Sequence, residues 1–297
     1  MTASRRAAVL GHPVAHSLSP VLHTAAYDAL GLDGWAYSAI DTIAEDLPAL
    51  VRGLDLGWAG LSVTMPLKQA IMPLLDHVDP LAVAVGAVNT VLVAPAQCGV
   101  VLTGTNTDVY GLVTALREGL GAQGTSRDAV TRSAVVLGGG ATAASTLAAL
   151  GELGCTRPRV LVRSLGRSAG LQEAAARMGV APRFEVLDAS ASLGALLDAD
   201  LVVSTMPAYA ADPVADALSA RGATPAGVLL DVVYDPRPTA LSSTWAASGG
   251  TVVGGERMLL HQAVEQVRLM TGRVAPVAAM DAALTGALAA PAGTAAV

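Results

Sequence analysis

One segment near the middle of the chain constrains the fold more than any other, because an apolar run, a glycine cluster and a helical pattern follow one another directly. The apolar run Ser133–Leu137 leads into Gly138-Gly-Gly-Ala-Thr-Ala143, and helical spacing then continues to about Leu153. A second apolar run follows at Arg159–Val162. Runs this short are typical of buried strands. The segment therefore predicts a complete strand–helix–strand unit, whose two strands lie parallel in one sheet.

The glycine cluster predicts a nucleotide-binding loop. Gly138, Gly140 and Ala143 fit the pattern Gly-x-Gly-x-x-Gly/Ala, which combines a tight turn, close backbone approach to a pyrophosphate and close helix–strand packing. The start of the following helix favours an anion. A plain turn is the alternative in a chain with 31 glycines, but the flanking strands favour the nucleotide site. The loop also includes Gly139, Ala141 and Thr142, which we expect to contact the cofactor.

The end of the second strand indicates which dinucleotide binds. An NAD site normally has Asp or Glu there, to accept a hydrogen bond from the ribose 2′-hydroxyl. This strand ends instead in Arg163 and Ser164, Arg167 follows, and the first acid after them is Glu173. Guanidinium groups offer several fixed donors to phosphate oxygens. The pattern predicts NADP, whose 2′-phosphate these three residues would bind; the alternative is two solvated surface arginines.

Elsewhere, short apolar runs alternate with helical patterns, which predicts the α/β class with mostly parallel sheets. Further strands are expected at Ala7–Leu10, Trp35–Ile40, Trp58–Val63, Phe184–Leu187, Leu201–Ser204, Val228–Val233 and Thr251–Val253. A hairpin or sheet edge is expected from Ala87–Val93 and Val100–Leu102. Helices are expected at Pro20–Leu30, Leu47–Leu54, Pro66–Leu75 and Asp108 to about Leu120, with two more after Gly255 and a frayed tail after about Ala290.

A chain of 297 residues can hold two domains. We expect one α/β domain over residues 1–107. The glycine loop predicts a Rossmann-type NADP-binding domain over residues 108–254. The polar, glycine-containing stretch Gly121–Asp128 predicts a hinge near the start of that domain.

The composition excludes several classes of protein. Hydrophobic residues make up 53% of the chain and aromatic ones 3%, which suits a core of Ala, Val and Leu between helices and a parallel sheet. A net charge of −6 argues against nucleic acid, which requires a basic face. The two cysteines and five histidines have no metal-ligand spacing, so we expect no metal and two buried free thiols in a reducing compartment. Apolar runs are too interrupted to span a membrane, and we expect a cytoplasmic protein.

Three short motifs place chemically useful side chains at the ends of apolar runs: Gly60-Leu-Ser-Val-Thr-Met-Pro-Leu-Lys68, Gly86-Ala-Val-Asn-Thr90 and Asn106-Thr-Asp108. A lysine beside a carboxylate is a compact proton-transfer device. In the first turn of a helix, Lys68 would oppose the helix dipole and contribute little to stability. The alternatives are a solvated lysine, and an aspartate that only stabilises a helix N-terminus.

Taken together, six motifs resemble those of the shikimate dehydrogenase family, in the family's order and over essentially residues 7 to 275. They are Gly11-His-Pro-Val-Ala-His-Ser-Leu-Ser-Pro20, Ser62-Val-Thr-Met-Pro-Leu-Lys68, Gly86-Ala-Val-Asn-Thr90, Asn106-Thr-Asp108, Asp231-Val-Val-Tyr-Asp-Pro236 and Gly255-Glu-Arg-Met-Leu-Leu-His-Gln262. The family reduces 3-dehydroshikimate to shikimate with NADPH, on the route to chorismate and the aromatic amino acids. The resemblance implies that residues 1–107 and 255–297 form the substrate-binding catalytic domain.

The resemblance also implies roles for individual residues. Lys68 and Asp108 match the family's catalytic pair. The substrate would be bound by Ser17, Ser19, Thr64, Asn89, Tyr234 and Gln262. In addition to the glycine loop and the arginines, the cofactor would contact Met206, Val232 and Gly255. For Ser17 and Ser19, the alternative is capping of the helix that follows them.

Three departures from the family's pattern affect the cofactor half. Val162-Arg-Ser164 replaces the usual Asn-Arg-Thr, Ser204-Thr-Met-Pro207 replaces the Asn-Ala-Thr loop, and the glycine loop has Gly-Gly-Gly-Ala instead of Gly-Ala-Gly-Gly. A quinate/shikimate dehydrogenase that uses NAD is one alternative function, and a ligand-binding paralogue without turnover is another. Either a monomer or a homodimer is compatible with the sequence.

Overall fold

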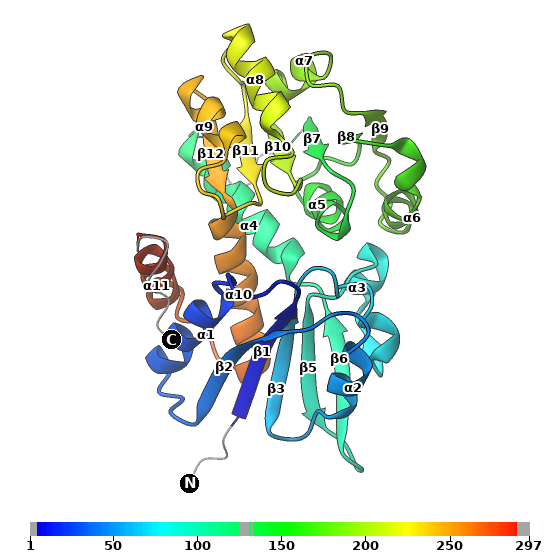
Figure 1. Ribbon diagram of the computed structural model, residues 1–297, viewed down its shortest axis with the longest axis vertical. Coiled ribbons are helices and arrows are strands. Elements are labelled where there is room, and N and C mark those ends of the chain that lie inside the picture. Colours follow the sequence, from blue (N-terminus) through cyan, green and yellow to red (C-terminus); the bar gives the residue numbers. More distant parts are fainter. Residues whose placement is uncertain (1–4, 125–130, 132, 290–297) are drawn as a thin grey trace. The chain divides into compact units, whose positions relative to one another are not determined.

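The computed structural model describes residues 5–124, 131 and 133–289. It divides into two compact units, each with its own six-stranded sheet (Figure 1). The first unit comprises residues 5–83, 87–107 and 262–289 of the described chain, and the second comprises 84–86 and the described part of 108–261. Residues 125–128 of the expected hinge and the expected frayed tail from 290 lie outside the described residues.

The sheet of the first unit has the strand order β2-β1-β3-β5-β6-β4. Its strands are β1 (Arg5–Gly11), β2 (Trp35–Asp41), β3 (Trp58–Val63), β4 (His77–Val78), β5 (Thr90–Pro95) and β6 (Val100–Thr105). Only β5 runs antiparallel to its neighbours β3 and β6. The carboxyl ends of β1, β3 and β6 therefore lie at the same edge of the sheet as the amino end of β5.

Helices cover both faces of this sheet, because successive side chains of a strand point to opposite sides. On one face, Ala8 and Leu10 of β1 pack with Leu47 and Val51 of α2 (Leu47–Arg52). On the other face, Ala7 of the same strand packs with Ala59 and with Met270 of α10 (Gly255–Thr271), most of which lies in this unit. The other helices of this unit are α1 (Ser19–Ala29) and α11 (Val277–Ala289).

The sheet of the second unit is entirely parallel, in the order β12-β11-β10-β7-β8-β9. Its strands are β7 (Ala134–Leu137), β8 (Arg159–Val162), β9 (Arg183–Val186), β10 (Leu201–Ser204), β11 (Val228–Asp231) and β12 (Thr251–Gly254). The chain moves outward from β7 in one direction and then restarts at β10 on the other side. This is the doubly wound order of dinucleotide-binding domains, with the reversal point between β7 and β10.

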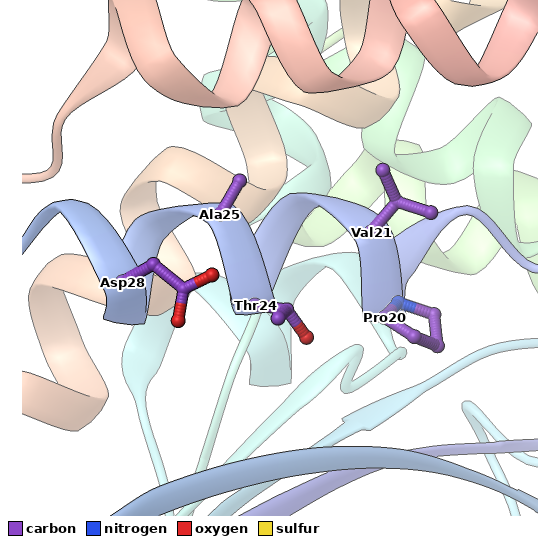
Figure 2. A pocket seen from close by; sticks show the side chains of 5 residues that line it. All are labelled: Pro20, Val21, Thr24, Ala25 and Asp28. Carbon is purple, nitrogen blue, oxygen red and sulfur yellow. The ribbon is translucent and has the colours of Figure 1, made fainter. Parts of the chain in front are cut away.

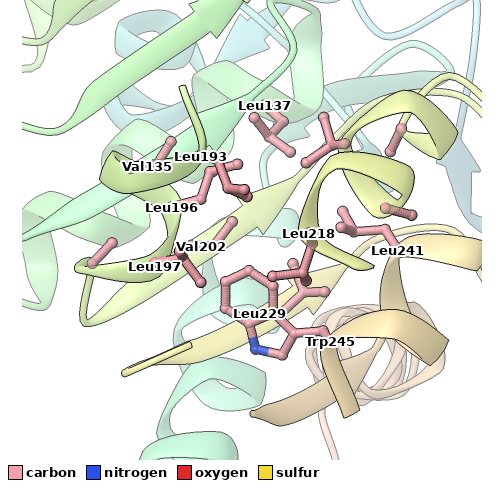
Figure 3. Packing of buried hydrophobic residues seen from close by; sticks show 14 of the residues in the cluster. Val135, Leu137, Leu193, Leu196, Leu197, Val202, Leu218, Leu229, Leu241 and Trp245 are labelled. Atoms are coloured by element: carbon pink, nitrogen blue, oxygen red, sulfur yellow. The ribbon is translucent and has the colours of Figure 1, made fainter. Parts of the chain in front are cut away.

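Helices also cover both faces of the second sheet. On one face, Leu229 of β11 packs with Leu218 of α8 (Asp212–Arg221) and with the fully buried Trp245 of α9 (Ala240–Ala247), as Figure 3 shows. Val228, the preceding residue of the strand, faces α4 (Asp108–Ala122) on the other side. The other helices of this unit are α5 (Ala141–Glu152), α6 (Ala169–Arg177) and α7 (Leu193–Leu197), and most of α3 (Pro80–Val85) lies in the first unit.

The expected helix at Pro66–Leu75 is wrong. The segment forms turns and a single 3₁₀ turn, η1 (Met72–Leu74). Two local features oppose a helix: Pro73 has no N–H to donate within it, and the carbonyl oxygen of Lys68 accepts from the backbone N–H of Val88 at 2.8 Å. Lys68 therefore lies in a turn, so the argument from the helix dipole does not apply to it.

Two expectations from composition can be compared with the structure. Cys155 is buried, but Cys98 is exposed in the turn between β5 and β6, so the expectation of two buried thiols is wrong for Cys98. Among the described residues, no helix has both the length and the apolar character needed to cross a membrane.

Candidate active site

The predicted substrate residues of the first unit follow or precede strand ends at one edge of its sheet. Thr64 follows β3, Asn89 precedes β5, Ser17 lies between β1 and α1, and Ser19 is the first residue of α1. The strands are in register at this edge, since Ser62 pairs with Thr90 and Thr90 pairs with Thr105. Ligands of open α/β sheets bind outside such strand ends. The sheet thus brings residues from distant parts of the sequence to one place.

Asn89 lies at the centre of this group and is buried. Its Oδ1 accepts from the backbone N–H of Thr107 at 2.7 Å, and its Nδ2 donates to Gln262 Oε1 at 3.4 Å. A backbone N–H can only donate, so the orientation of the Asn89 amide is fixed by Thr107. Asn89 and Gln262 are therefore brought together, and Asp108 is the next residue of the chain after Thr107.

The two predicted catalytic residues come from different units. Lys68 is half-buried in the first unit, and its carbonyl oxygen bonds to the residue before Asn89. Asp108 is buried and begins α4 of the second unit, where a carboxylate suits the positive end of the helix dipole. The segment before it is anchored by Asn106, whose Nδ2 donates to the carbonyl oxygen of Ala87 at 2.9 Å.

The two predicted serines are not simple helix caps. The N-cap residue of α1 is Leu18, and its side chain makes no capping hydrogen bond. Ser17 Oγ accepts from the backbone N–H of Ser19 at 3.3 Å. Ser19 is buried, and its hydroxyl is hydrogen-bonded to Tyr37 of β2. The Ser19 hydroxyl thus contacts the interior of the unit as well as the sheet edge.

The glycine loop of the second unit has the geometry of an anion-binding turn. Gly138 follows β7 at the reversal point of the sheet, with a φ of +113° that disfavours any other residue. A Cβ atom at Gly138 would also collide with Thr205 Oγ1. Gly140 is extended and serves as the N-cap of α5, so the first backbone N–H groups of this helix follow the turn. The loop fits a pyrophosphate.

The predicted 2′-phosphate residues occupy one short loop after β8. Arg163 and Arg167 are exposed and Ser164 is half-buried. Hydrogen bonds of Ser168 hold the loop. Its Oγ donates to the carbonyl oxygen of Leu165 at 2.6 Å and accepts from Gln172 Nε2 at 2.8 Å. Two exposed guanidinium groups on a braced loop suit a phosphate group.

Val232, which follows β11, and Gly255, which follows β12, are in direct contact. A Cβ atom at Gly255 would overlap the carbonyl group of Val232, so only glycine allows this approach. Asp231 holds the same loop, since its Oδ2 accepts from Thr239 Oγ1 at 2.7 Å. Burial raises the pKa of the Asp231 carboxyl.

The two remaining predicted residues of the second unit are half-buried. Met206 lies after β10, next to Thr205, whose Oγ1 donates to the carbonyl oxygen of Leu137 at 2.9 Å. Tyr234 lies in the loop after β11, where burial and the nearby Asp235 raise the pKa of its phenol.

A polar cluster beside Asn89 was not predicted from the sequence. It consists of the half-buried Tyr37 and five buried residues, His23, Ser62, Thr90, Thr107 and Gln266. Most of these residues interrupt apolar patterns, and Gln266 lies one helical turn after Gln262, which is the signal that could have identified it. Among the described residues, no group of three His, Cys, Asp or Glu side chains could hold a metal ion.

A separate open groove runs along α1 and is not part of this site. It is lined by Pro20, Val21, Thr24, Ala25 and Asp28. Figure 2 shows Val21 and Ala25 pointing toward the neighbouring α11, while the polar side chains point elsewhere. None of these residues was predicted to bind substrate or cofactor.

A doubly wound sheet with a glycine loop at its reversal point, in one chain with a second α/β unit that gathers buried polar side chains, defines a nicotinamide-dinucleotide-dependent oxidoreductase. Two family models match the chain. One is described as the shikimate dehydrogenase substrate binding domain and covers residues 9–91, and the other as the shikimate 5'-dehydrogenase C-terminal domain and covers residues 255–285.

Individual relatives match over nearly the whole length. The shikimate dehydrogenase (NADP(+)) of Geobacter sp. strain M21 is 40% identical over 291 residues, which are 97% of each chain. The crystal structure of Mycobacterium tuberculosis shikimate dehydrogenase is 41% identical, with a TM-score of 0.80 over 95% of this chain and 99% of that one. Quinate dehydrogenase from Corynebacterium glutamicum in complex with NAD is 30% identical, with a TM-score of 0.80 over the same shares. The chain belongs to the shikimate dehydrogenase family.

Proposed function

We propose that this protein catalyses the reversible, NADP-dependent reduction of 3-dehydroshikimate to shikimate, a step toward chorismate and the aromatic amino acids. One observation carries the proposal: Asn89, Gln262 and Thr107 form a buried hydrogen-bonded group directly before Asp108, and the Lys68 backbone is bonded beside it. Short polar donors and acceptors of this kind suit a small substrate with several oxygens. The relatives named shikimate dehydrogenase (NADP(+)) support the choice of substrate and cofactor.

We expect one unit to bind the substrate and the other to bind NADP. Residues 1–107 and 255–297 would form the substrate-binding catalytic domain, and residues 108–254 the NADP-binding domain. The division of the structure into compact units after Thr107 supports the first boundary. The later division of those units, between His261 and Gln262, lies within α10. The first turns of α10 would therefore serve the nucleotide and its later turns the substrate.

The second unit has the groups that NADP requires. The backbone of residues 138–142 would hold the pyrophosphate, Arg163, Ser164 and Arg167 the 2′-phosphate, and Met206, Val232 and Gly255 the nicotinamide end. When bound, the nicotinamide supplies or accepts the hydride. The close approach of Gly255 to the Val232 carbonyl group presents backbone rather than side chains at that end, and a flat ring would pack against it.

In the first unit, Ser17, Ser19, Thr64, Asn89 and Gln262 would bind the hydroxyl and carboxylate groups of the substrate, joined by Tyr234. Lys68 would then take the hydroxyl proton during oxidation and return it during reduction. Asp108 would accept a hydrogen bond from that hydroxyl or from the Lys68 ammonium. These roles need a lysine whose Nζ exchanges a proton with the substrate hydroxyl, and an aspartate held in place by its helix.

Oxidation of quinate with NAD is the second candidate, because the Corynebacterium quinate dehydrogenase shares the whole fold. Arg163 and Arg167 favour NADP, since NAD has no 2′-phosphate for them to bind. A steady-state assay with shikimate and quinate, each with NADP and NAD, tests both. We expect the highest kcat/KM with shikimate and NADP. A higher value with quinate and NAD would support the second candidate, and no turnover with any pair would support a ligand-binding paralogue.

We further propose a cytoplasmic enzyme whose partners are its small-molecule substrates, with no role for nucleic acid or a membrane. A net charge of −6 supports this. Either a monomer or a homodimer is compatible with the two-unit fold, and sedimentation velocity would distinguish them.

A further inference from the structure

A hydrogen-bonded network lies beneath the predicted substrate residues of the first unit, on the face of the sheet covered by α1 and α10. It links His23 of α1, Tyr37 of β2, Ser62 of β3 and Gln266 of α10. His23, Ser62 and Gln266 are almost completely buried. Buried polar groups are costly unless they are paired, so the orientation of each member constrains the next.

The Gln266 amide can adopt only one orientation in this network. Its Nε2 donates to Thr90 Oγ1 at 3.0 Å and lies 3.4 Å from the backbone carbonyl oxygen of Asn89, which can only accept. A flipped amide would set two carbonyl oxygens against each other. Its Oε1 must therefore face the opposite side, where it accepts from Ser62 Oγ at 2.8 Å.

His23 completes that opposite side as a neutral donor. Its Nε2 lies 3.2 Å from Gln266 Oε1, which only accepts, so Nε2 carries the proton and Nδ1 accepts from Tyr27 at 3.4 Å. The ring stacks on Tyr37 at 3.9 Å between centroids. Burial lowers the pKa of His23 to about 4, against the hydrogen bond to Gln266 that raises it. The titratable groups that face the imidazole, Tyr27 from α1 and Tyr37 from β2, are uncharged phenols.

Tyr37 connects this side of the network to Ser19. The Tyr37 hydroxyl donates to Ser62 Oγ at 2.6 Å, so the Ser62 hydroxyl must direct its own hydrogen to Gln266. The same Tyr37 hydroxyl is hydrogen-bonded to Ser19. Ser19 is one of the predicted substrate residues, so a change at Tyr37 would reach the substrate site through Ser19 as well as through Gln266.

On the other side, the orientation of Gln266 passes to Asn89. Thr90 Oγ1 accepts from Gln266, so it uses its hydrogen to donate to Asn89 Oδ1 at 2.9 Å. The backbone N–H of Thr107 donates to the same oxygen. Asn89 Nδ2 is thereby turned toward Gln262 Oε1. The Asn89 carbonyl can only accept and the Thr107 N–H can only donate. These two backbone groups therefore fix which side chain donates and which accepts throughout the network.

We propose that Tyr37, Ser62 and Gln266 are positioning residues of the substrate site, which hold the side chains of Ser19, Asn89 and Gln262 in a single orientation without touching the substrate. The proposal rests on the proposed function for the substrate that binds these three. Loss of the network would remove the support that the Thr90 hydroxyl gives to Asn89, which loosens the Asn89 and Gln262 side chains. Substrate binding would weaken, and the nucleotide unit would be unaffected.

Gln266→Glu tests the polarity directly, because it exchanges the donating NH₂ for an oxygen of the same size. As a carboxylate this group cannot donate to Thr90, whereas its protonated form can. We expect the KM for shikimate to rise about tenfold at pH 9 and to recover toward the wild-type value as the pH falls, while the KM for NADP stays within about twofold. Gln266→Leu should raise the shikimate KM at every pH.

Gln123→Glu is the matched control, since it makes the same change at an exposed position after α4. Tyr37→Phe removes the hydroxyl and keeps the ring, so it provides a second test if the Gln266 variants do not fold. We expect this variant to raise the shikimate KM severalfold. The proposal is overturned if Tyr37→Phe or Gln266→Leu binds shikimate as the wild type does, or if the KM values for shikimate and NADP rise together. A wild-type protein that does not turn over shikimate would instead contradict the proposed function.

Discussion

Lys68 is the residue on which the proposed chemistry depends most. It lies in a turn after β3, where its backbone is bonded to Val88 and its side chain is half-buried. Lys68→Ala is expected to lower kcat by about a hundredfold or more with a modest change in the shikimate KM, the scale of a lost proton-transfer group. Gln69→Ala, at the exposed neighbouring position, is the control. A kcat within a few-fold of wild type would remove Lys68 from the proton route.

His23 makes a prediction about stability that is independent of catalysis. Because burial lowers its pKa from 6.5 to about 4, the unfolded chain binds a proton between these two values and the folded protein does not. Stability should therefore rise with pH across this window and be lost as the pH falls through it, by about 3 kcal/mol in all. Urea unfolding at pH 4 and pH 7 measures the effect. His23→Gln should reduce this pH dependence, and an unchanged slope in the variant would assign it to other groups.

At the scale of residues, the sequence suggested candidates where a motif marked them, and it missed polar partners inside β3 and α10. Asn89 and Gln262 were expected from motifs, and they lie 3.4 Å apart, although their roles stay predictions. Ser62 and Gln266 were missed, because a polar residue inside an apolar pattern shows its purpose only through its partner. The partners of Gln266 are 176 and 204 positions away in sequence, which no local pattern can reveal.

At the scale of elements, strands were easier to predict than turns. The runs Trp58–Val63, Arg159–Val162 and Leu201–Ser204 were expected with the bounds they have, since buried parallel strands are continuous apolar runs. The helix expected at Pro66–Leu75 failed, because a distant N–H, that of Val88, takes the carbonyl oxygen of Lys68. Tertiary hydrogen bonds of this kind override local helix preference. Helices α6 to α9 were not predicted from the sequence, because they are short and their apolar and polar residues do not form a clear helical pattern.

The loop after β8 is the element that should select the cofactor. Arg163 and Arg167 are exposed on a loop that Ser168 braces. Replacing both arginines with alanine should raise the KM for NADPH by about a hundredfold and leave the KM for NADH nearly unchanged, because each lost charge-assisted bond is worth roughly 1.5–3 kcal/mol. Arg183→Ala, on the neighbouring β9, is the control. Equal losses for both cofactors would place these arginines outside the 2′-phosphate site.

At the scale of the whole molecule, two units with separate cores should respond separately to their ligands. A ligand at about 100 times its Kd stabilises the folded state by about 2.7 kcal/mol, which for units of this size shifts Tm by roughly 5–10 °C. NADP and shikimate should each produce such a shift in the wild type.

The arginine double variant should lose the NADP shift and keep the shikimate shift. Asn89→Ala should do the opposite, since Asn89 is hydrogen-bonded to Gln262 and Thr107 of the first unit. Thermal denaturation of the three proteins with each ligand provides the measurement. If either variant lost both shifts, the proposed division into a substrate domain and a nucleotide domain would be wrong.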